Sequence, residues 1–193
     1  LHIGPEVVIS FFFSMNHMCS VASHMVGVPH IACERNNPYM SPYRDEDRKK
    51  RDDAFCKAEG CVFQTEKAVN YFSGKLIGLH TIIDNPVCEN VNPALQLAEN
   101  GINKIVTVGR YAEQKNYYFL IDVFCLFRTK HPEFILECYG KDSGEYKKIN
   151  QYIIDKGMEG CILLKRETPY VHNCIASAKA FLFTPFFEGT PNA

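Results

Sequence analysis

The sequence predicts an α/β fold built from two Rossmann-like, doubly wound parallel-sheet halves, and three observations lead to it. Short continuous apolar runs recur along the 193 residues, as expected of parallel strands buried on both faces. Amphipathic segments separate these runs, so strands and helices alternate. The alternation lapses between Asn85 and Asn103, where Asp84-Asn85-Pro86 and Asn90-Val91-Asn92-Pro93 have turn chemistry.

The predicted strands are the apolar runs themselves. In chain order they are Val7–Phe13, His30–Cys33, Cys61–Gln64, His80–Ile83, Lys104–Val108, Phe134–Tyr139, Cys161–Leu164 and Ala180–Thr184.

The helices between the strands follow from apolar spacing and capping residues. A helix over Asn116–Lys130 places Leu120 and Phe124 on one face. Ser143 is expected to cap the next helix, and Thr168-Pro169 to begin a third that runs through Ala178.

The lapse in the pattern sets the predicted domain bounds. Residues 1–88 form the first half, 89–103 a linker and 104–193 the second half. The chain starts in a strand and stops in a loop that opens a helix, so we expect both halves to be incomplete pieces of a longer protein.

Composition narrows the class of protein. Hydrophobic residues make up 46% and charged residues 22%, as in an ordinary globular chain. A net charge of -1 gives no electrostatic reason to bind nucleic acid. No apolar run reaches a membrane-spanning length. The nine cysteines include no C-x-x-C pair, so we interpret them as free thiols of a cytosolic protein.

The most informative segment joins the strand Lys104–Val108 to Gly109, Arg110 and Lys115. Ligands of open α/β sheets bind at the carboxyl ends of strands. Gly109 lets the backbone approach a ligand, Arg110 offers a bidentate fork to phosphate oxygens, and Lys115 can reach the same anion. The alternative, a tight turn with two exposed cations, stays open on spacing alone.

Two further segments place polar groups at strand ends. Glu188 follows a strand and precedes Thr190-Pro191, which resembles a helix start and so offers N–H groups to a diphosphate. Glu34, Arg35 and Asn36 follow the strand His30–Cys33 and suit a polar cleft. Each also has a plain structural interpretation, a loop cap or a surface ion pair.

Taken together in chain order, these segments and several others resemble glycosyltransferase family 4, the retaining enzymes with the two-Rossmann-domain B-type fold. The resemblance covers nearly the whole chain and is greatest to bacterial members that build surface glycans. The matching segments are Val7-Val8-Ile9-Ser10-Phe11, Cys33-Glu34-Arg35-Asn36-Asn37-Pro38, Gly60-Cys61-Val62-Phe63-Gln64-Thr65-Glu66, Asp84-Asn85-Pro86-Val87, Val108-Gly109-Arg110 with Gln114-Lys115-Asn116, and Glu188-Gly189-Thr190-Pro191-Asn192-Ala193.

The resemblance implies a role for each matched residue. Arg110 and Lys115 would hold the donor diphosphate and stabilise the leaving nucleotide, and Glu188 would contact the sugar. The remaining implied substrate-binding residues are Gly109, Gly189, Thr190, Pro191, Asn192, Glu34, Arg35 and Asn36.

The resemblance also implies partners and place. The donor would be a nucleotide-sugar, expected to be a UDP-sugar, serving as co-substrate without a separate cofactor. The acceptor would be a glycan or a lipid-linked sugar, and the protein would be cytoplasmic with peripheral contact to the inner face of the membrane. A non-catalytic nucleotide-sugar-binding protein and a sugar-nucleotide epimerase of similar fold are the alternatives.

The chain departs from the family at three places. The second acid of the E-x7-E motif would fall beyond Ala193, so this stretch alone is expected to be inactive. Gly140-Lys141-Asp142-Ser143-Gly144 replaces the usual G-x-G-P turn, and Leu164-Lys165-Arg166 replaces an apolar-Gly ending near the nucleotide base.

No residue set predicts a metal site. The charged segment Arg44–Asp53 contains Asp45-Glu46-Asp47, formally the D-x-D motif that glycosyltransferases of another fold use to hold a cation. It lies in a charge run and not at the end of an apolar strand, so we interpret it as a solvated helix. Transfer is therefore expected to be independent of metal.

Overall fold

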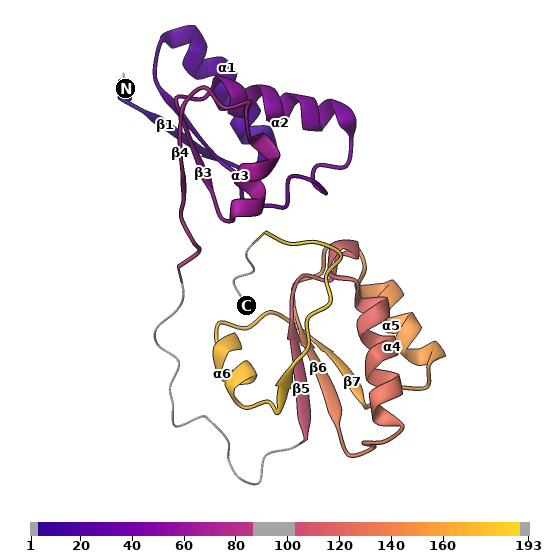
Figure 1. Cartoon of the computed structure of the whole chain (residues 1–193). Coiled ribbons are helices and arrows are strands. Elements are labelled where there is room, and N and C mark those ends of the chain that lie inside the picture. The colour runs from indigo at the N-terminus through magenta and orange to yellow at the C-terminus, as the bar shows by residue number, and fades with distance from the viewer. Residues whose placement is uncertain (1–3, 87–102, 190–193) are drawn as a thin grey trace. The chain divides into compact units, whose positions relative to one another are not determined.

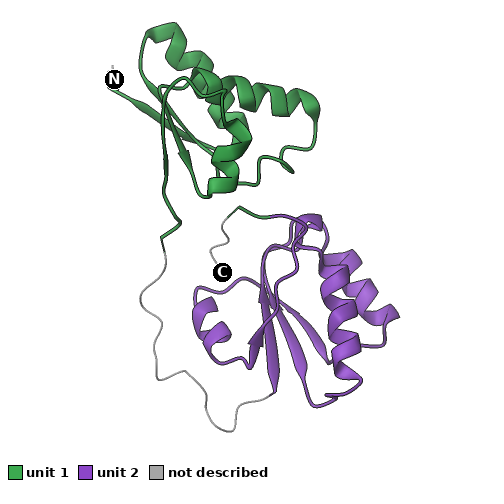
Figure 2. Cartoon of the chain, in the orientation of Figure 1, with its two compact units in different colours: residues 1–87, 188–192 green, residues 88–187, 193 purple. Residues whose placement is uncertain are grey.

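The computed structural model describes residues 4–86 and 103–189, which form two compact units (Figure 2). Unit 1 comprises Leu1–Val87 with Glu188–Asn192, and unit 2 comprises Cys88–Phe187 with Ala193. The positions of the two units relative to one another are not determined. The predicted domain bounds stay a prediction, and most of the predicted linker 89–103 lies outside the described residues.

Within its described residues, unit 1 is a parallel sheet in the order β1-β2-β3-β4. The strands are β1 (Val8–Phe11), β2 (His30–Cys33), β3 (Gly60–Phe63) and β4 (Leu79–Ile82). The crossovers between them are α1 (Phe13–Val26), α2 (Asp45–Lys57) and α3 (Glu66–Phe72).

The strand order of unit 1 places its helices on one face. Right-handed crossovers that always step in the same direction stay on one side of a sheet, and Figure 1 shows α1, α2 and α3 there. Phe55, Phe63 and Phe72 are fully buried beneath them. The opposite face is open, with Ile9 55% and Leu79 85% exposed.

Unit 2 has the strand order β7-β6-β5-β8 within its described residues, again all parallel. Its elements are β5 (Lys104–Val108), the 3-10 helix η2 (Glu113–Lys115), α4 (Tyr117–Arg128), β6 (Ile135–Tyr139), α5 (Tyr146–Asp155), β7 (Ile162–Lys165), α6 (Val171–Ala176) and β8 (Ala180–Phe181).

The direction of winding in unit 2 reverses at β5. The chain steps outward from β5 to β6 and β7, then returns to place β8 on the other side of β5. Helices α4 and α5 therefore lie on one face of the sheet and α6 on the other (Figure 1). Leu120 and Phe124 of α4 pack with Leu136, Ile149 and Ile153 in the core beneath α4 and α5.

Some predicted element bounds are wrong, each for a local reason. The strand predicted over Val7–Phe13 ends at Phe11, because Phe12 has φ +68° and Phe13 opens α1. Ser143 does not cap α5. The Asp142 carboxylate takes that place instead, accepting from the amides of Gly144 at 2.8 Å and Tyr146 at 3.2 Å.

The end of the described chain also differs from prediction. The helix expected from Thr168-Pro169 through Ala178 is the shorter α6, which begins at Val171 and ends at Ala176. The Thr168 hydroxyl still accepts from the Tyr170 amide at 3.2 Å, so it supports the turn before the helix. Strand β8 ends at Phe181, before the predicted Thr184.

The charge run forms α2 as predicted, but one side chain contradicts the solvated interpretation. Asp45 and Glu46 are exposed at the first turn of α2. Arg51, two turns later, is 0% exposed. A pattern of charge cannot predict this, because a long cationic side chain can be buried wherever the fold supplies enough acceptors.

Candidate functional site

The carboxyl edge of the unit 2 sheet contains a topological switch point. Strands β6 and β8 flank β5, and their connections leave on opposite faces, which opens a crevice where ligands of α/β sheets bind. The loop after β5 carries Gly109, Arg110 and Lys115. The segment after β8 runs beside this loop, since the Phe186 amide donates to the Gln114 carbonyl at 3.0 Å and Gln114 Nε2 donates to the Phe187 carbonyl at 3.0 Å.

Two glycines bring the ends of β5 and β6 into backbone contact. A Cβ atom at Gly140 would lie 1.9 Å from the Gly109 carbonyl oxygen, so no other residue fits there without moving a strand. At Gly109, a Cβ would lie 3.2 Å from Cδ and Cε of Lys115. The aliphatic part of the lysine therefore covers Gly109, and its Nζ lies 5.0 Å from the Phe183 ring centroid.

Arg110 lies in the edge that this contact creates. It is exposed and helps to line a hollow of 200 Å³ together with Gly109, Gly140, Lys141 and Glu167. The predicted cation at the end of β5 thus lies where a ligand can reach it. Whether Arg110 and Lys115 hold one anion stays a prediction.

A larger hollow of 590 Å³ continues from the first around the ends of β6 and β7. It shares Gly140, Lys141 and Glu167 with the smaller one and adds further basic and aromatic side chains. Its full lining is Tyr111, Gly140, Lys141, Asp142, Tyr146, Leu164, Lys165, Arg166 and Glu167.

Lys141, Lys165 and Arg166 are not among the site residues predicted from the sequence. They belong to segments that depart from the family pattern. The signal that could have found them is positional: each lies at or just after the carboxyl end of a parallel strand, the edge where ligands of such sheets bind.

Two buried tyrosines hold this edge together. The Tyr111 hydroxyl lies 2.6 Å from both the Cys138 and the Lys165 carbonyl oxygens, and so links β6 to β7. The Tyr117 hydroxyl donates to the Gly109 carbonyl at 2.7 Å. Burial raises the pKa of both phenols, so they are neutral donors at physiological pH.

Glu137 of β6 is a buried carboxylate that contacts Lys165, one of the residues lining the larger hollow. It is 7% exposed and is held by Lys165 Nζ at 2.5 Å, Lys104 Nζ at 3.3 Å and the Tyr139 hydroxyl at 2.9 Å. Burial alone raises the pKa of Glu137, but these cations and the hydroxyl outweigh it and leave the pKa below the usual value. The ion cluster fixes the direction of Lys165 at the pocket wall.

The pKa of Glu137 is lower in the folded state than the value of about 4.3 expected in the unfolded chain. Ionised Glu137 therefore stabilises unit 2 above about pH 4.3, and this stabilisation is lost as the pH falls through the folded-state pKa. We expect Glu137→Gln to lower the unfolding free energy by about 1–3 kcal/mol at neutral pH. Between neutral pH and about pH 3 the variant should lose less stability than the wild type. Urea unfolding at both pH values measures this, with the half-exposed Glu133→Gln as control; equal acid losses in wild type and Glu137→Gln would contradict it.

In unit 1, the predicted polar residues follow the carboxyl end of β2. Glu34 is 7% exposed, and its Oε1 accepts from the amides of Arg35 at 3.0 Å and Asn36 at 2.9 Å. Burial raises the pKa of Glu34 above its usual value. This carboxylate therefore shapes the loop that presents Arg35 and Asn36, and the Arg35 guanidinium lies 5.9 Å from the Phe11 ring centroid.

The last predicted residues fall partly outside the described ranges. Thr190, Pro191 and Asn192, and with them the predicted helix start, are among the residues that the structure does not describe. Gly189 belongs to unit 1, where a Cβ would lie 2.5 Å from the Arg35 carbonyl oxygen, so a side chain would collide with backbone. Glu188 also belongs to unit 1, and its contact with the donor sugar stays a prediction.

Within residues 4–86 and 103–189 no cluster of His, Cys, Asp and Glu has the arrangement of a metal site. In the same ranges, no helix is both long and apolar enough to cross a membrane.

Comparison with solved structures identifies the fold of the chain. Neither a protein-family model nor a curated protein sequence matches the chain. Among solved structures, Anabaena Alr3699/HepE in complex with UDP and glucose matches with a TM-score of 0.80 and 14% identity, over 93% of this chain and 52% of that one. The pneumococcal O-GlcNAc transferase GtfA in complex with UDP and GlcNAc matches with a TM-score of 0.72 and 16% identity, over 95% and 38%.

The lipopolysaccharide outer core galactosyltransferase WaaB matches with a TM-score of 0.67 and 17% identity, over 97% of this chain and 52% of its own. These likenesses show that the chain has the glycosyltransferase B-type fold, with two parallel-sheet halves. The chain spans about half the length of HepE and WaaB.

Proposed function

We propose that the protein is a retaining glycosyltransferase of the family 4 type that transfers a sugar from a UDP-sugar to a glycan or lipid-linked acceptor in the synthesis of surface polysaccharide. One observation carries the proposal: Arg110 lies at the switch point of unit 2, beside a glycine–glycine backbone contact and next to a hollow whose lining includes Lys141, Lys165 and Arg166. The fold likeness to structures solved with UDP supports the choice of donor.

The chemistry follows from the charge that develops in the reaction. Breaking the anomeric bond leaves a nucleoside diphosphate with added negative charge, which fixed cations stabilise where no metal does so. In this proposal Arg110 binds the phosphate oxygens through its two-pronged guanidinium, and Lys115 adds a point charge. Glu188 accepts hydrogen bonds from sugar hydroxyls, and Gly109 and Gly189 let backbone groups approach the donor.

The acceptor would bind at the edge of unit 1. Arg35 and Asn36 are held there by the buried Glu34 carboxylate and offer hydrogen-bond donors that suit sugar hydroxyls. The anomeric configuration of the donor sugar would be retained if the acceptor hydroxyl attacks the anomeric carbon from the same face that the diphosphate leaves. A glycosidase would need two carboxyl groups, one on each side of the glycosidic bond. Glu188 is the single carboxylate that we propose in the site.

The cytoplasmic location belongs to the same proposal. All eight cysteines in the described ranges are free thiols, which is usual in a reducing compartment. Burial raises the pKa of the Cys61 thiol to about 12, so it is an unreactive packing group and not a nucleophile.

Transfer is expected to continue in excess chelator, because Arg110 and Lys115 stabilise the leaving diphosphate in place of a metal ion. The assay follows UDP release from UDP-glucose by the full-length protein, with and without EDTA. Loss of transfer in EDTA, with recovery on adding magnesium or manganese, would contradict this part of the mechanism. UDP binding without any transfer would favour the non-catalytic binding protein.

A further inference from the structure

Arg51 on α2 is fully buried in a helix whose other charged side chains mostly face solvent. Its Nη1 donates to the Pro38 carbonyl at 2.9 Å and also to the Ser41 carbonyl. Both acceptors belong to the loop over 34–44, which joins β2 to α2. A buried arginine cannot lose its charge, so its hydrogen bonds must be satisfied for unit 1 to fold.

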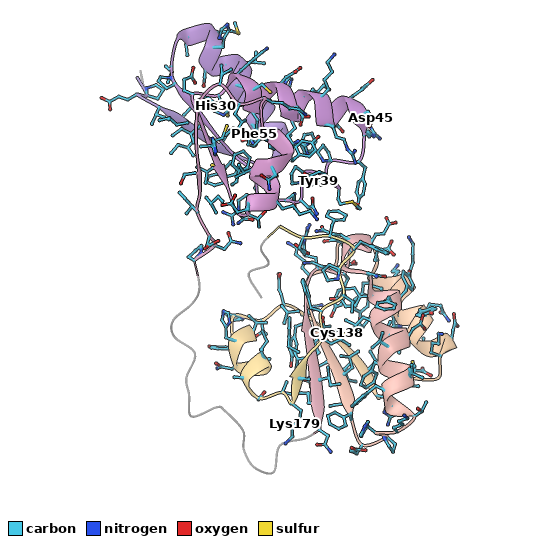
Figure 3. All side chains as sticks on the ribbon, in the orientation of Figure 1. His30, Tyr39, Asp45, Phe55, Cys138 and Lys179 are labelled. Atoms are coloured by element: carbon cyan, nitrogen blue, oxygen red, sulfur yellow. The ribbon has the colours of Figure 1, made fainter. Side chains whose placement is uncertain are left out.

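Other groups around Arg51 compensate its charge. Its Nε and Nη2 donate to Asp52 Oδ1 at 3.0 and 2.8 Å. Its guanidinium lies 4.8 Å from the ring centroid of Tyr71 and 5.5 Å from that of Phe72, both on α3. The Tyr71 ring in turn meets the loop residue Tyr39 edge-on at 4.9 Å, and Figure 3 labels Tyr39 in this loop. Arg51 therefore connects the loop over 34–44 to α2 and α3.

The same side chain also reaches the start of the loop. Arg51 Nε lies 4.0 Å from Glu34 Oε2, while Glu34 Oε1 accepts from the Arg35 and Asn36 amides. One guanidinium thus faces the carboxylate that sets the first residues of the loop and binds carbonyls in its middle. The flexible stem of a lysine could supply the charge, but not this set of directed donors.

We propose that Arg51 is a positioning residue that fixes the loop over 34–44, so that Arg35 and Asn36 meet the acceptor sugar in one geometry. The proposal rests on the proposed function for the identity of the ligand. Its structural part, that Arg51 holds the backbone at 35–36, does not.

The test compares Arg51→Met and Arg51→Lys with two controls on the same helix. Phe55→Leu disturbs the buried core of unit 1 at a ring that packs on Phe63 and Phe72, and Lys50→Met removes an exposed charge. Amide hydrogen exchange at Arg35 and Asn36 reports on the loop. Transfer from UDP-glucose to octyl glucoside, octyl galactoside and octyl N-acetylglucosaminide gives KM for these probe acceptors, and UDP titration gives donor affinity.

In Arg51→Met we expect exchange at Asn36 to accelerate about tenfold or more, while exchange in β3 stays near wild type. Acceptor KM should rise about tenfold, because misplaced positioning groups weaken binding, with UDP affinity changed by less than about twofold. Arg51→Lys, which keeps the charge, should recover part of both effects. Phe55→Leu, compared at equal distance below its own melting temperature, should leave acceptor KM within about twofold of wild type.

Unchanged exchange at Arg35 and Asn36 in both Arg51 variants would overturn the proposal. So would an acceptor KM in Arg51→Met no higher than in Phe55→Leu. If Arg51→Met does not fold, the same comparisons are made with Arg51→Lys. If wild type neither binds UDP nor transfers a sugar, the proposed function fails, and amide exchange alone then decides whether Arg51 holds the loop.

Discussion

Replacing Arg110 by alanine is expected to lower kcat/KM for the nucleotide-sugar donor about a hundredfold, the usual cost of losing one preorganised charge-stabilising donor. Arg110 is exposed at the carboxyl edge of β5, in the hollow next to Gly140 and Lys141. Contacts to a leaving diphosphate strengthen as the bond breaks, so kcat should fall more than KM rises. Steady-state kinetics of UDP release from UDP-glucose by the full-length protein measure both constants.

The matched variant is Arg110→Lys, which keeps the positive charge but loses the bidentate fork. It should recover only part of the lost rate. Because the Arg110 side chain is exposed, neither variant should change the melting temperature appreciably. Near-wild-type transfer by Arg110→Ala would remove Arg110 from the donor site and leave the tight turn with an exposed cation as its explanation.

Replacing Gly140 by alanine is expected to have the second large effect, this time on both stability and activity. The new Cβ would lie 1.9 Å from the Gly109 carbonyl oxygen, and backbone cannot move aside as a side chain can. Forced overpacking of this kind costs about 1–3 kcal/mol, and a backbone clash belongs at the upper end. Thermal unfolding should show the loss.

The same substitution should also weaken UDP binding. The ends of β5 and β6 would separate, and Arg110 and Lys141 would move with them. Gly4→Ala is the control, because a Cβ there meets nothing within 4 Å and should change neither property. Unaltered stability in Gly140→Ala would show that the two strand ends are not in contact.

The sequence predicted the fold well because apolar runs and amphipathic spacing report burial directly. Strands β2 and β5 have the bounds expected from pattern alone. The errors lie at ends, where single residues decide. Phe12 takes a left-handed backbone angle that no pattern of hydrophobicity encodes, and the Asp142 carboxylate takes the capping place expected of Ser143.

The candidate site was predictable where a motif and a strand end coincide. Arg110 satisfied both conditions and lies at the switch point. Lys141 and Arg166 satisfied only the second, since they belong to turns that depart from the family pattern. Arg51 satisfied neither, because its role comes from carbonyls at Pro38 and Ser41 that approach it only in the folded chain.

The most direct test of the central claim is calorimetric titration of UDP into the full-length protein and its Arg110→Ala variant. The account predicts that UDP binds the wild type at one site per chain. It also predicts that the Arg110→Ala variant binds UDP at least about tenfold more weakly, a difference of about 1.4 kcal/mol or more. No binding of UDP to the wild type, or equal affinity in the two proteins, would contradict the assignment of a nucleotide-sugar site to the carboxyl edge of unit 2.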